Sequence, residues 1–135
     1  LLALQQALSL SSWLGSMVVV LHVVDSHAVE ETYPGVKPLS RKRLRRLRDE
    51  AADRMARFIR DNAVDHHAAK AGLRLKTSFA RGSPAAEILE AAKSHEAGLI
   101  ILGVRGDGGI KPPLIGSTVE RVIRLASRPV LVVKG

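Results

Sequence analysis

The sequence predicts an α/β fold with a parallel sheet that is covered by helices on both faces. Short apolar runs rich in β-branched residues alternate with longer segments whose apolar residues recur at helical spacing. This alternation is typical of parallel strands, which need helical crossovers. The chain has 135 residues, 46% of them hydrophobic, which is enough for a core of its own. We therefore expect one domain over residues 1–135.

The first half of the chain predicts two helices and two strands. Residues 1 to about 14 are an expected helix, and Met17 to Val24 is an expected strand. One face of this helix carries Leu1, Leu4, Ala7, Leu8 and Ser11. A loop is expected from Ser26 to Ser40, where two prolines and a glycine fall. A long helix then runs to about residue 70 and is closed by Gly72; its apolar positions are Leu44, Leu47, Ala51, Met55, Phe58 and Ile59.

The second half repeats the pattern. Leu73 to Ala80 is an expected strand, and the next helix runs from Pro84 to about His95, with proline in its first turn. Leu99 to Leu102 is an apolar strand, Ser117 to Ser127 a helix, and Val130 to Val133 the last strand. The inward positions expected on the two helices are Ile88, Leu89, Ala92, Val119, Val122, Ile123 and Ala126.

The segment between residues 102 and 117 contains glycines at a characteristic spacing. Gly103 is followed by two residues and Gly106, then by nine residues and the pair Gly116–Ser117. Glycine allows positive φ and close approach of the backbone to a ligand, so we expect such turns at Gly103 and Gly106. We expect Ser117 to cap the following helix. Free amides and the positive end of the helix dipole then point where an anion would sit.

This segment resembles the universal stress protein family. The ATP-binding branch of that family carries the same spacing of three glycines and a serine or threonine, and Arg128 to Lys134 resembles its last strand. Upstream, Leu21 to Asp25 resembles the second strand of the family, and Gly82 to Ala85 the turn before its third helix. The resemblance implies an open five-stranded Rossmann-like sheet in the order 3-2-1-4-5.

The resemblance also implies a nucleotide site. Its phosphate-binding part would comprise Gly103, Arg105, Gly106, Gly116, Ser117 and Thr118, and its adenine end the backbone of Val23 and Val24. Asp107 departs from the family pattern and would repel phosphates, unless Arg105 and Lys111 offset it or Mg²⁺ bridges it to them. The expected cofactor is therefore ATP, with Mg²⁺ as a candidate companion.

In the family, a central strand precedes the first helix, and this chain starts inside that helix. Without this central strand, the two strands beside it would lose hydrogen-bond partners, so we expect further residues before Leu1 in the native protein. The alternatives are that another chain or a rearranged register fills the gap.

Several classes of protein are not favoured. The chain has no cysteine, so it has no disulfide and no cysteine-rich metal site. The histidines lack metal-ligand spacing, and His22 is expected to pack within its strand. No apolar run is long enough for a membrane helix, and the start lacks the pattern of a signal peptide, so we expect a cytoplasmic protein.

Six Lys and Arg residues lie between residues 41 and 48 of a chain with net charge +8. They form either a site for nucleic acid or an anionic membrane, or the solvated face of a helix. Leu44 and Leu47 keep helical spacing within the cluster, so we expect the solvated face.

The expected function is that of an ATP-binding stress-response or regulatory protein with an unidentified protein partner. The alternatives are a slow Mg²⁺-dependent ATPase and a regulatory domain of a larger transporter or kinase. The apolar edge strand at residues 130–134 predicts a homodimer, because a bare edge invites pairing and family members pair there.

Overall fold

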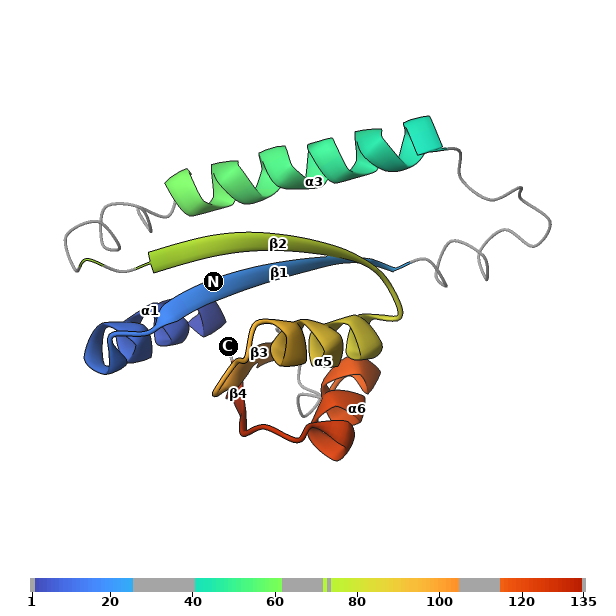
Figure 1. Cartoon of the computed structure of the whole chain (residues 1–135). Coiled ribbons are helices and arrows are strands. Elements are labelled where there is room, and N and C mark those ends of the chain that lie inside the picture. The colour runs from blue at the N-terminus through green and yellow to red at the C-terminus, as the bar shows by residue number, and fades with distance from the viewer. Residues whose placement is uncertain (1, 26–40, 62–71, 73, 105–114, 135) are drawn as a thin grey trace, which may run out of the picture.

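The computed structural model describes residues 2–25, 41–61, 72, 74–104 and 115–134. Its helices and strands alternate in the order α1 (Leu2–Leu14), β1 (Met17–Asp25), α3 (Arg41–Asp61), β2 (Arg74–Gly82), α5 (Pro84–Ser94), β3 (Ile100–Val104), α6 (Ser117–Leu125) and β4 (Val130–Lys134) (Figure 1). The elements expected from the sequence are thus confirmed wherever residues are described. The loop expected at 26–40 and the helical continuation expected to about residue 70 lie outside the described residues.

The described strands form two parallel pairs. β1 and β2 pair from Met17 opposite Arg74 to Asp25 opposite Gly82. β3 and β4 pair from Ile100 opposite Val130 to Val104 opposite Lys134. The expected α/β class with parallel strands is therefore confirmed. Within the described ranges the pairs are separate two-stranded sheets, so the expected five-strand order is not present as one continuous ladder.

Two helices hold the strand pairs together. α1 packs against β1 as well as against β3 and β4, and α5 packs against β1, β2 and α6. Figure 1 shows α3 along one side of the β1–β2 pair, with α1 and α5 on the other side. The β1–β2 pair is thus covered by helices on both sides, as the alternating pattern predicts.

Apolar side chains form two clusters. One joins Ala85 and Ala92 of α5 to Ile100 of β3 and Val122 of α6. The other joins Leu8 of α1 and Ile59 of α3, and its partly buried members are Leu4, Val18, Met55 and Leu75. Ile88 and Leu89 pack against the first cluster, as helical spacing predicts.

Two positions differ from the expectation. Ile123 and Phe58 were predicted to lie on the apolar faces of their helices, and both are exposed. Ile123 follows Val122, which is fully buried, and successive residues of a helix point about 100° apart. The buried stripe of the nine-residue α6 is therefore narrower than the apolar pattern predicts, with Val119 and Val122 as its buried residues.

Candidate functional site: the start of helix α6 and the ends of the strands

Both ends of the predicted phosphate-binding segment are fixed by the fold. β3 ends at Val104, which is buried, and α6 begins at Ser117 directly after Gly116. Val104 is paired with Lys134, so the strand that enters the segment is held by the β3–β4 ladder. The predictions made for Arg105, Gly106, Asp107 and Lys111 concern residues that lie outside the described ranges.

The first turn of α6 has no side-chain cap. Gly116 occupies the cap position with extended backbone (φ −62°, ψ 151°), and its carbonyl accepts a hydrogen bond from the amide of Glu120 at 3.0 Å. Ser117, expected to be the cap, is instead the first residue of the helix, followed by Thr118. Because the first amides of a helix have no acceptor within it, this turn presents N–H donors at the positive end of the helix dipole.

The space around Gly116 is open. A Cβ atom added there would meet no atom of the described residues within 4 Å, and Gly116 and Ser117 are both exposed. The described residues therefore leave the first turn of α6 unobstructed at Gly116. A larger side chain at residue 116 would meet no atom of the described residues.

Gly103 behaves differently from the expectation. It lies in β3 opposite Val133 and does not have positive φ, because the ladder holds its backbone extended. A Cβ atom added there would lie 3.5 Å from the Cβ of Ala3, an ordinary contact. Gly103 thus faces helix α1, and the predicted positive φ at this residue is wrong.

One ion pair modifies the charge near the start of α6. The Arg124 guanidinium donates a hydrogen bond of 2.8 Å to the carboxylate of Glu120, one turn earlier. Both side chains are well exposed, so the pair contributes little to stability. Its effect at the site is to place a cation beside the carboxylate of the first turn, which would otherwise repel an approaching anion.

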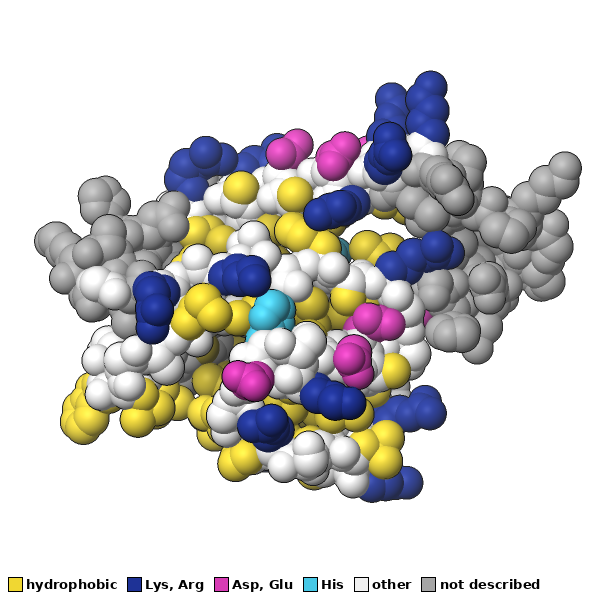
Figure 2. All heavy atoms as spheres, in the orientation of Figure 1, with side chains coloured by type: hydrophobic (Ala, Val, Ile, Leu, Met, Phe, Trp, Pro, Cys, Tyr) yellow, Lys and Arg dark blue, Asp and Glu magenta, His cyan; other side chains and the backbone are white. Residues whose placement is uncertain are grey.

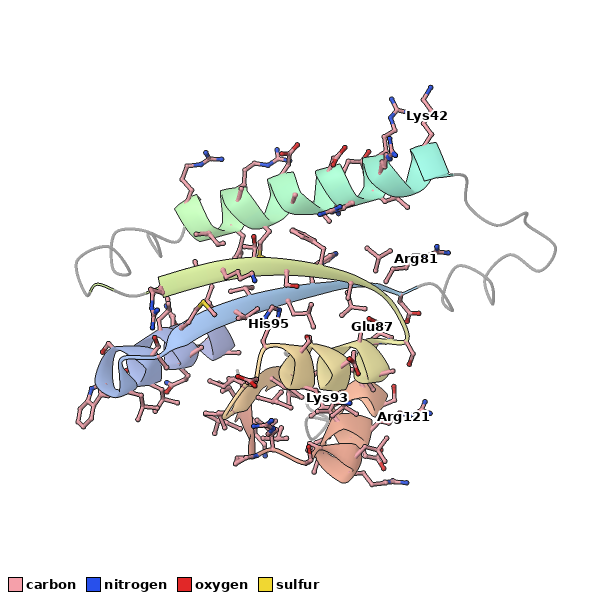
Figure 3. All side chains as sticks on the ribbon, viewed as in Figure 1. Lys42, Arg81, Glu87, Lys93, His95 and Arg121 are labelled. Carbon is pink, nitrogen blue, oxygen red and sulfur yellow. The ribbon has the colours of Figure 1, made fainter. Side chains whose placement is uncertain are left out.

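The carboxyl ends of β1 and β2 lie side by side. Val23, Val24 and Asp25 are half-buried and stand opposite Ala80, Arg81 and Gly82. Gly82 has φ +154°, and a Cβ atom there would collide with the carboxylate of Glu87 from the first turn of α5. The Glu87 carboxylate can move aside, so the preference for glycine in this turn comes from the positive φ. Figure 3 shows Arg81 at this end of the molecule, where Lys42 also lies in the first turn of α3.

The structure also contains two cavities that sequence reasoning missed. One, of about 370 Å³, lies between β1 and α3 and is lined by His22, Ala51, Arg54, Met55 and Phe58. The ring of His22 packs edge-on against Phe79, with ring centroids 6.1 Å apart, which confirms His22 as a packed histidine. The other cavity, of about 270 Å³, lies beside α5, and its lining includes Leu89 and Lys93 with Arg128. Neither cavity is lined by a residue predicted to contact a nucleotide.

Two structural features bear on the class of protein. Among the described residues, no three acidic or histidine side chains are grouped so that they could hold a metal ion. In the same part of the chain, no helix combines the length and the apolar character that a membrane span requires.

Comparison with known proteins agrees with this fold. The profile of the universal stress protein family matches residues 1–134. The chain is similar to universal stress protein YxiE of Bacillus subtilis (strain 168), with 41% identity over 76 residues, and this match covers 56% of the chain but only 51% of YxiE. It is also similar to universal stress protein MJ0577 of Methanocaldococcus jannaschii, with 28% identity over 129 residues, 87% of the chain and 76% of that protein.

A solved structure extends the similarity to three dimensions. Universal stress protein UspA from Lactobacillus plantarum superimposes with a TM-score of 0.62 and 25% identity, covering 97% of this chain and 86% of that one. The similarity therefore includes both strand pairs and the helices between them. It places the chain among Rossmann-like α/β folds.

Proposed function

The chain belongs to the universal stress protein family, and on that basis we propose that it is a cytoplasmic stress-response or regulatory protein that binds an adenine nucleotide, with ATP as the first candidate. The observation that carries this proposal is the start of α6. Its first turn is uncapped, and the open space at Gly116 lies in front of it. The glycine spacing ends at this same turn, so the motif and the free amides coincide.

The proposed site divides the nucleotide between two parts of the fold. The phosphates would lie against the amides of Ser117 and Thr118 and against the glycine segment from Gly103 through Arg105 and Gly106 to Gly116. Amides at a helix start suit phosphate because they donate hydrogen bonds to anionic oxygens in a favourable dipole field. The adenine would lie at the end of β1, near the backbone of Val23 and Val24. If Mg²⁺ accompanies ATP, Asp107 is the residue proposed to contact it.

We also propose that the two strand pairs belong to one sheet in the order β2, β1, a further parallel strand, β3 and β4. In the family's numbering, where β1 is the second strand, this is the order 3-2-1-4-5. The support is that α1 packs against both pairs and that α5 joins β1 and β2 to α6. Among the described strands, no hydrogen-bonded ladder joins the two pairs, and these helices contact both of them. In such a sheet, ligands bind beyond the carboxyl ends of the strands, at the point where the strand order reverses.

The edge strand β4 supports the proposed homodimer. Leu131 is an exposed apolar residue on this strand, and two copies could pair residues 130–134 across a two-fold axis. We expect light scattering to find a dimer, and Leu131→Lys to give monomer or insoluble protein. A monomer of the unchanged protein at high concentration would remove the dimer from the proposal.

The test of nucleotide binding is calorimetry with ATP and Mg²⁺, together with ADP and AMP. Gly116→Val should abolish the binding heat, because the branched side chain would fill the space in front of α6. Gly98→Val is the matched control, since a Cβ at Gly98 also meets no atom within 4 Å but lies outside the glycine segment. Ser117→Ala should weaken binding by about 1–3 kcal/mol if the hydroxyl contacts a phosphate.

The proposal fails if ATP at millimolar concentration gives no heat and does not raise the melting temperature. It also fails if Gly98→Val weakens binding as much as Gly116→Val does. A turnover assay with labelled ATP distinguishes binding alone from the alternative of slow hydrolysis.

A further inference from the structure

An apolar surface stands out at the end of the molecule where β1 begins. Trp13 is 89% exposed and Leu14 is 71% exposed, and Met17 at the start of β1 is also exposed. We call Trp13, Leu14 and Met17 the apolar tip. Figure 2 shows exposed hydrophobic side chains gathered at the end of the molecule where Figure 1 places the α1–β1 turn. Large apolar side chains that are exposed together indicate an interaction site.

The turn that carries the apolar tip is fixed by its own hydrogen bonds. Gly15 ends α1 with φ +61°, a conformation that glycine adopts without strain. The amide of Ser16 donates to the carbonyl of Ser11 at 3.3 Å, and the buried hydroxyl of Ser11 donates to the carbonyl of Ser16 at 2.8 Å. Trp13 and Leu14 are therefore held outward by the backbone, and binding through them costs little ordering of the turn.

On α1, β1 and β2, the described charged residues near the apolar tip are cations. Arg74 stands opposite Met17 in the β1–β2 ladder, and Lys76 follows two residues later; both are exposed. α1 contains no charged residue, β2 contains no acidic residue, and the single acidic residue of β1 is Asp25 at the other end of the strand. The secondary structure nearest the tip thus combines exposed apolar side chains with cations.

We propose that the apolar tip inserts into the interface of an anionic lipid surface, with Arg74 and Lys76 contacting headgroup phosphates. Three features favour lipid over a protein partner. The tip is a protruding turn and not a groove that would receive a side chain or a helix. Tryptophan has the amphipathic ring that is enriched where membranes meet water. The neighbouring cations complement anionic headgroups, each contributing attraction that falls off within a Debye length.

The basic segment 41–48 is not part of this surface. It lies in the first turns of α3, and Figure 3 shows Lys42 at the opposite end of the molecule from the α1–β1 turn. The inference is also independent of nucleotide binding, because no predicted nucleotide contact belongs to the tip. Because they lie at opposite ends of the molecule, the basic segment 41–48 and the cations beside the apolar tip can be tested separately.

Trp13 is the only tryptophan of the chain, so its fluorescence reports on the tip alone. The protein is titrated with vesicles of phosphatidylcholine, with and without phosphatidylglycerol. We expect the anionic vesicles to shift the emission of Trp13 to shorter wavelength and to protect it from acrylamide, with both effects lost at high salt. Neutral vesicles should give neither effect.

Substitutions test which residues contact the vesicle surface. Replacing both Arg74 and Lys76 by Gln should weaken binding about 25-fold, since each cation near the surface contributes about fivefold. Leu14→Ser should weaken it about tenfold through lost apolar burial. Arg45→Gln with Arg46→Gln is the matched control at the far end and should change binding less than about twofold. Circular dichroism checks that each variant is folded.

Three results would overturn the proposal. One is an emission spectrum that anionic vesicles leave unchanged. Another is a blue shift that follows protein concentration without vesicles, which would assign the tip to contact between copies of the chain. The third is an equal loss of binding in the control variant, which would assign the attraction to α3.

Discussion

The two strand pairs of this molecule are both parallel, yet they differ in how far their residues are buried. The shorter pair, β3 and β4, has Ile100 and Val104 buried in β3, and α5 and α6 pack at it around Val122. The longer pair, β1 and β2, has nine residues in each strand, and none of these residues is buried. Strand length therefore does not determine how well a pair is enclosed.

The difference follows from the helices. α5 packs against β1 and β2 as well as against α6, and its Ala85 and Ala92 are buried in the cluster that contains Ile100 and Val122. α3 is strongly basic, and over most of its length its side chains are exposed; Ala51 and Ile59 are its buried residues among those described. We infer that stability is concentrated in the half that anchors the proposed phosphate-binding segment. The β1–β2 half carries the basic helix and the apolar tip.

The largest expected effect is at Val122, the residue with no exposed surface. Val122→Asp places an unpaired charge in the better-packed core and should cost more than about 3 kcal/mol of unfolding free energy, or prevent folding. Ile123→Asp, at the exposed neighbouring position, should cost less than about 1 kcal/mol. Urea unfolding followed by circular dichroism measures both. Equal losses would contradict the burial contrast within α6.

A smaller effect is expected at Ile59, the buried anchor of α3. Ile59→Ala should cost about 2 kcal/mol, at the low end for such a change because the surroundings are loosely packed. Hydrogen exchange should speed up in α3 and β2 while α5 and β3 remain protected. Arg60→Ala, an exposed neighbour, is the control. Uniformly faster exchange across both halves would show that the two strand pairs do not differ in local stability.

The smallest expected effect concerns Ser11, which fixes the turn of the apolar tip. Ser11→Ala removes the 2.8 Å hydrogen bond to the carbonyl of Ser16 and should cost about 1 kcal/mol. Ser12→Ala, at an exposed position of the same helix, should be nearly neutral. Thermal melting compares the two. If the two variants melt alike, the turn is held by Gly15 and the backbone alone.

Much of the fold was predictable because apolar spacing dictates which helix faces become buried. Leu8, Ala92 and Val122 were identified on this ground, and each is buried. The degree of burial was not predictable: Phe58 and Ile59 both belong to the apolar pattern of α3, but packing buries Ile59 and leaves Phe58 exposed at the pocket beside His22. The preference for serine as a cap likewise failed at Ser117, because the helix begins one residue after Gly116.

The candidate site was predictable in part. The glycine spacing identified the segment that joins β3 to α6, and the structure adds that the first turn of α6 is uncapped. The apolar tip could not be found from the sequence, where Trp13 and Leu14 look like ordinary apolar residues of a helix. Their exposure depends on the turn at Gly15 and on where α1 packs against the strands.

The central claim is that an adenine nucleotide binds at the start of α6. The most direct test is titration of isotope-labelled protein with ATP and Mg²⁺, followed by amide chemical shifts in NMR spectra. We predict that the largest shifts occur at Ser117, Thr118 and Val119, with smaller ones at Val23 and Val24. Shifts confined to the cavity around His22 and Met55, or no shifts at millimolar ATP, would contradict the claim.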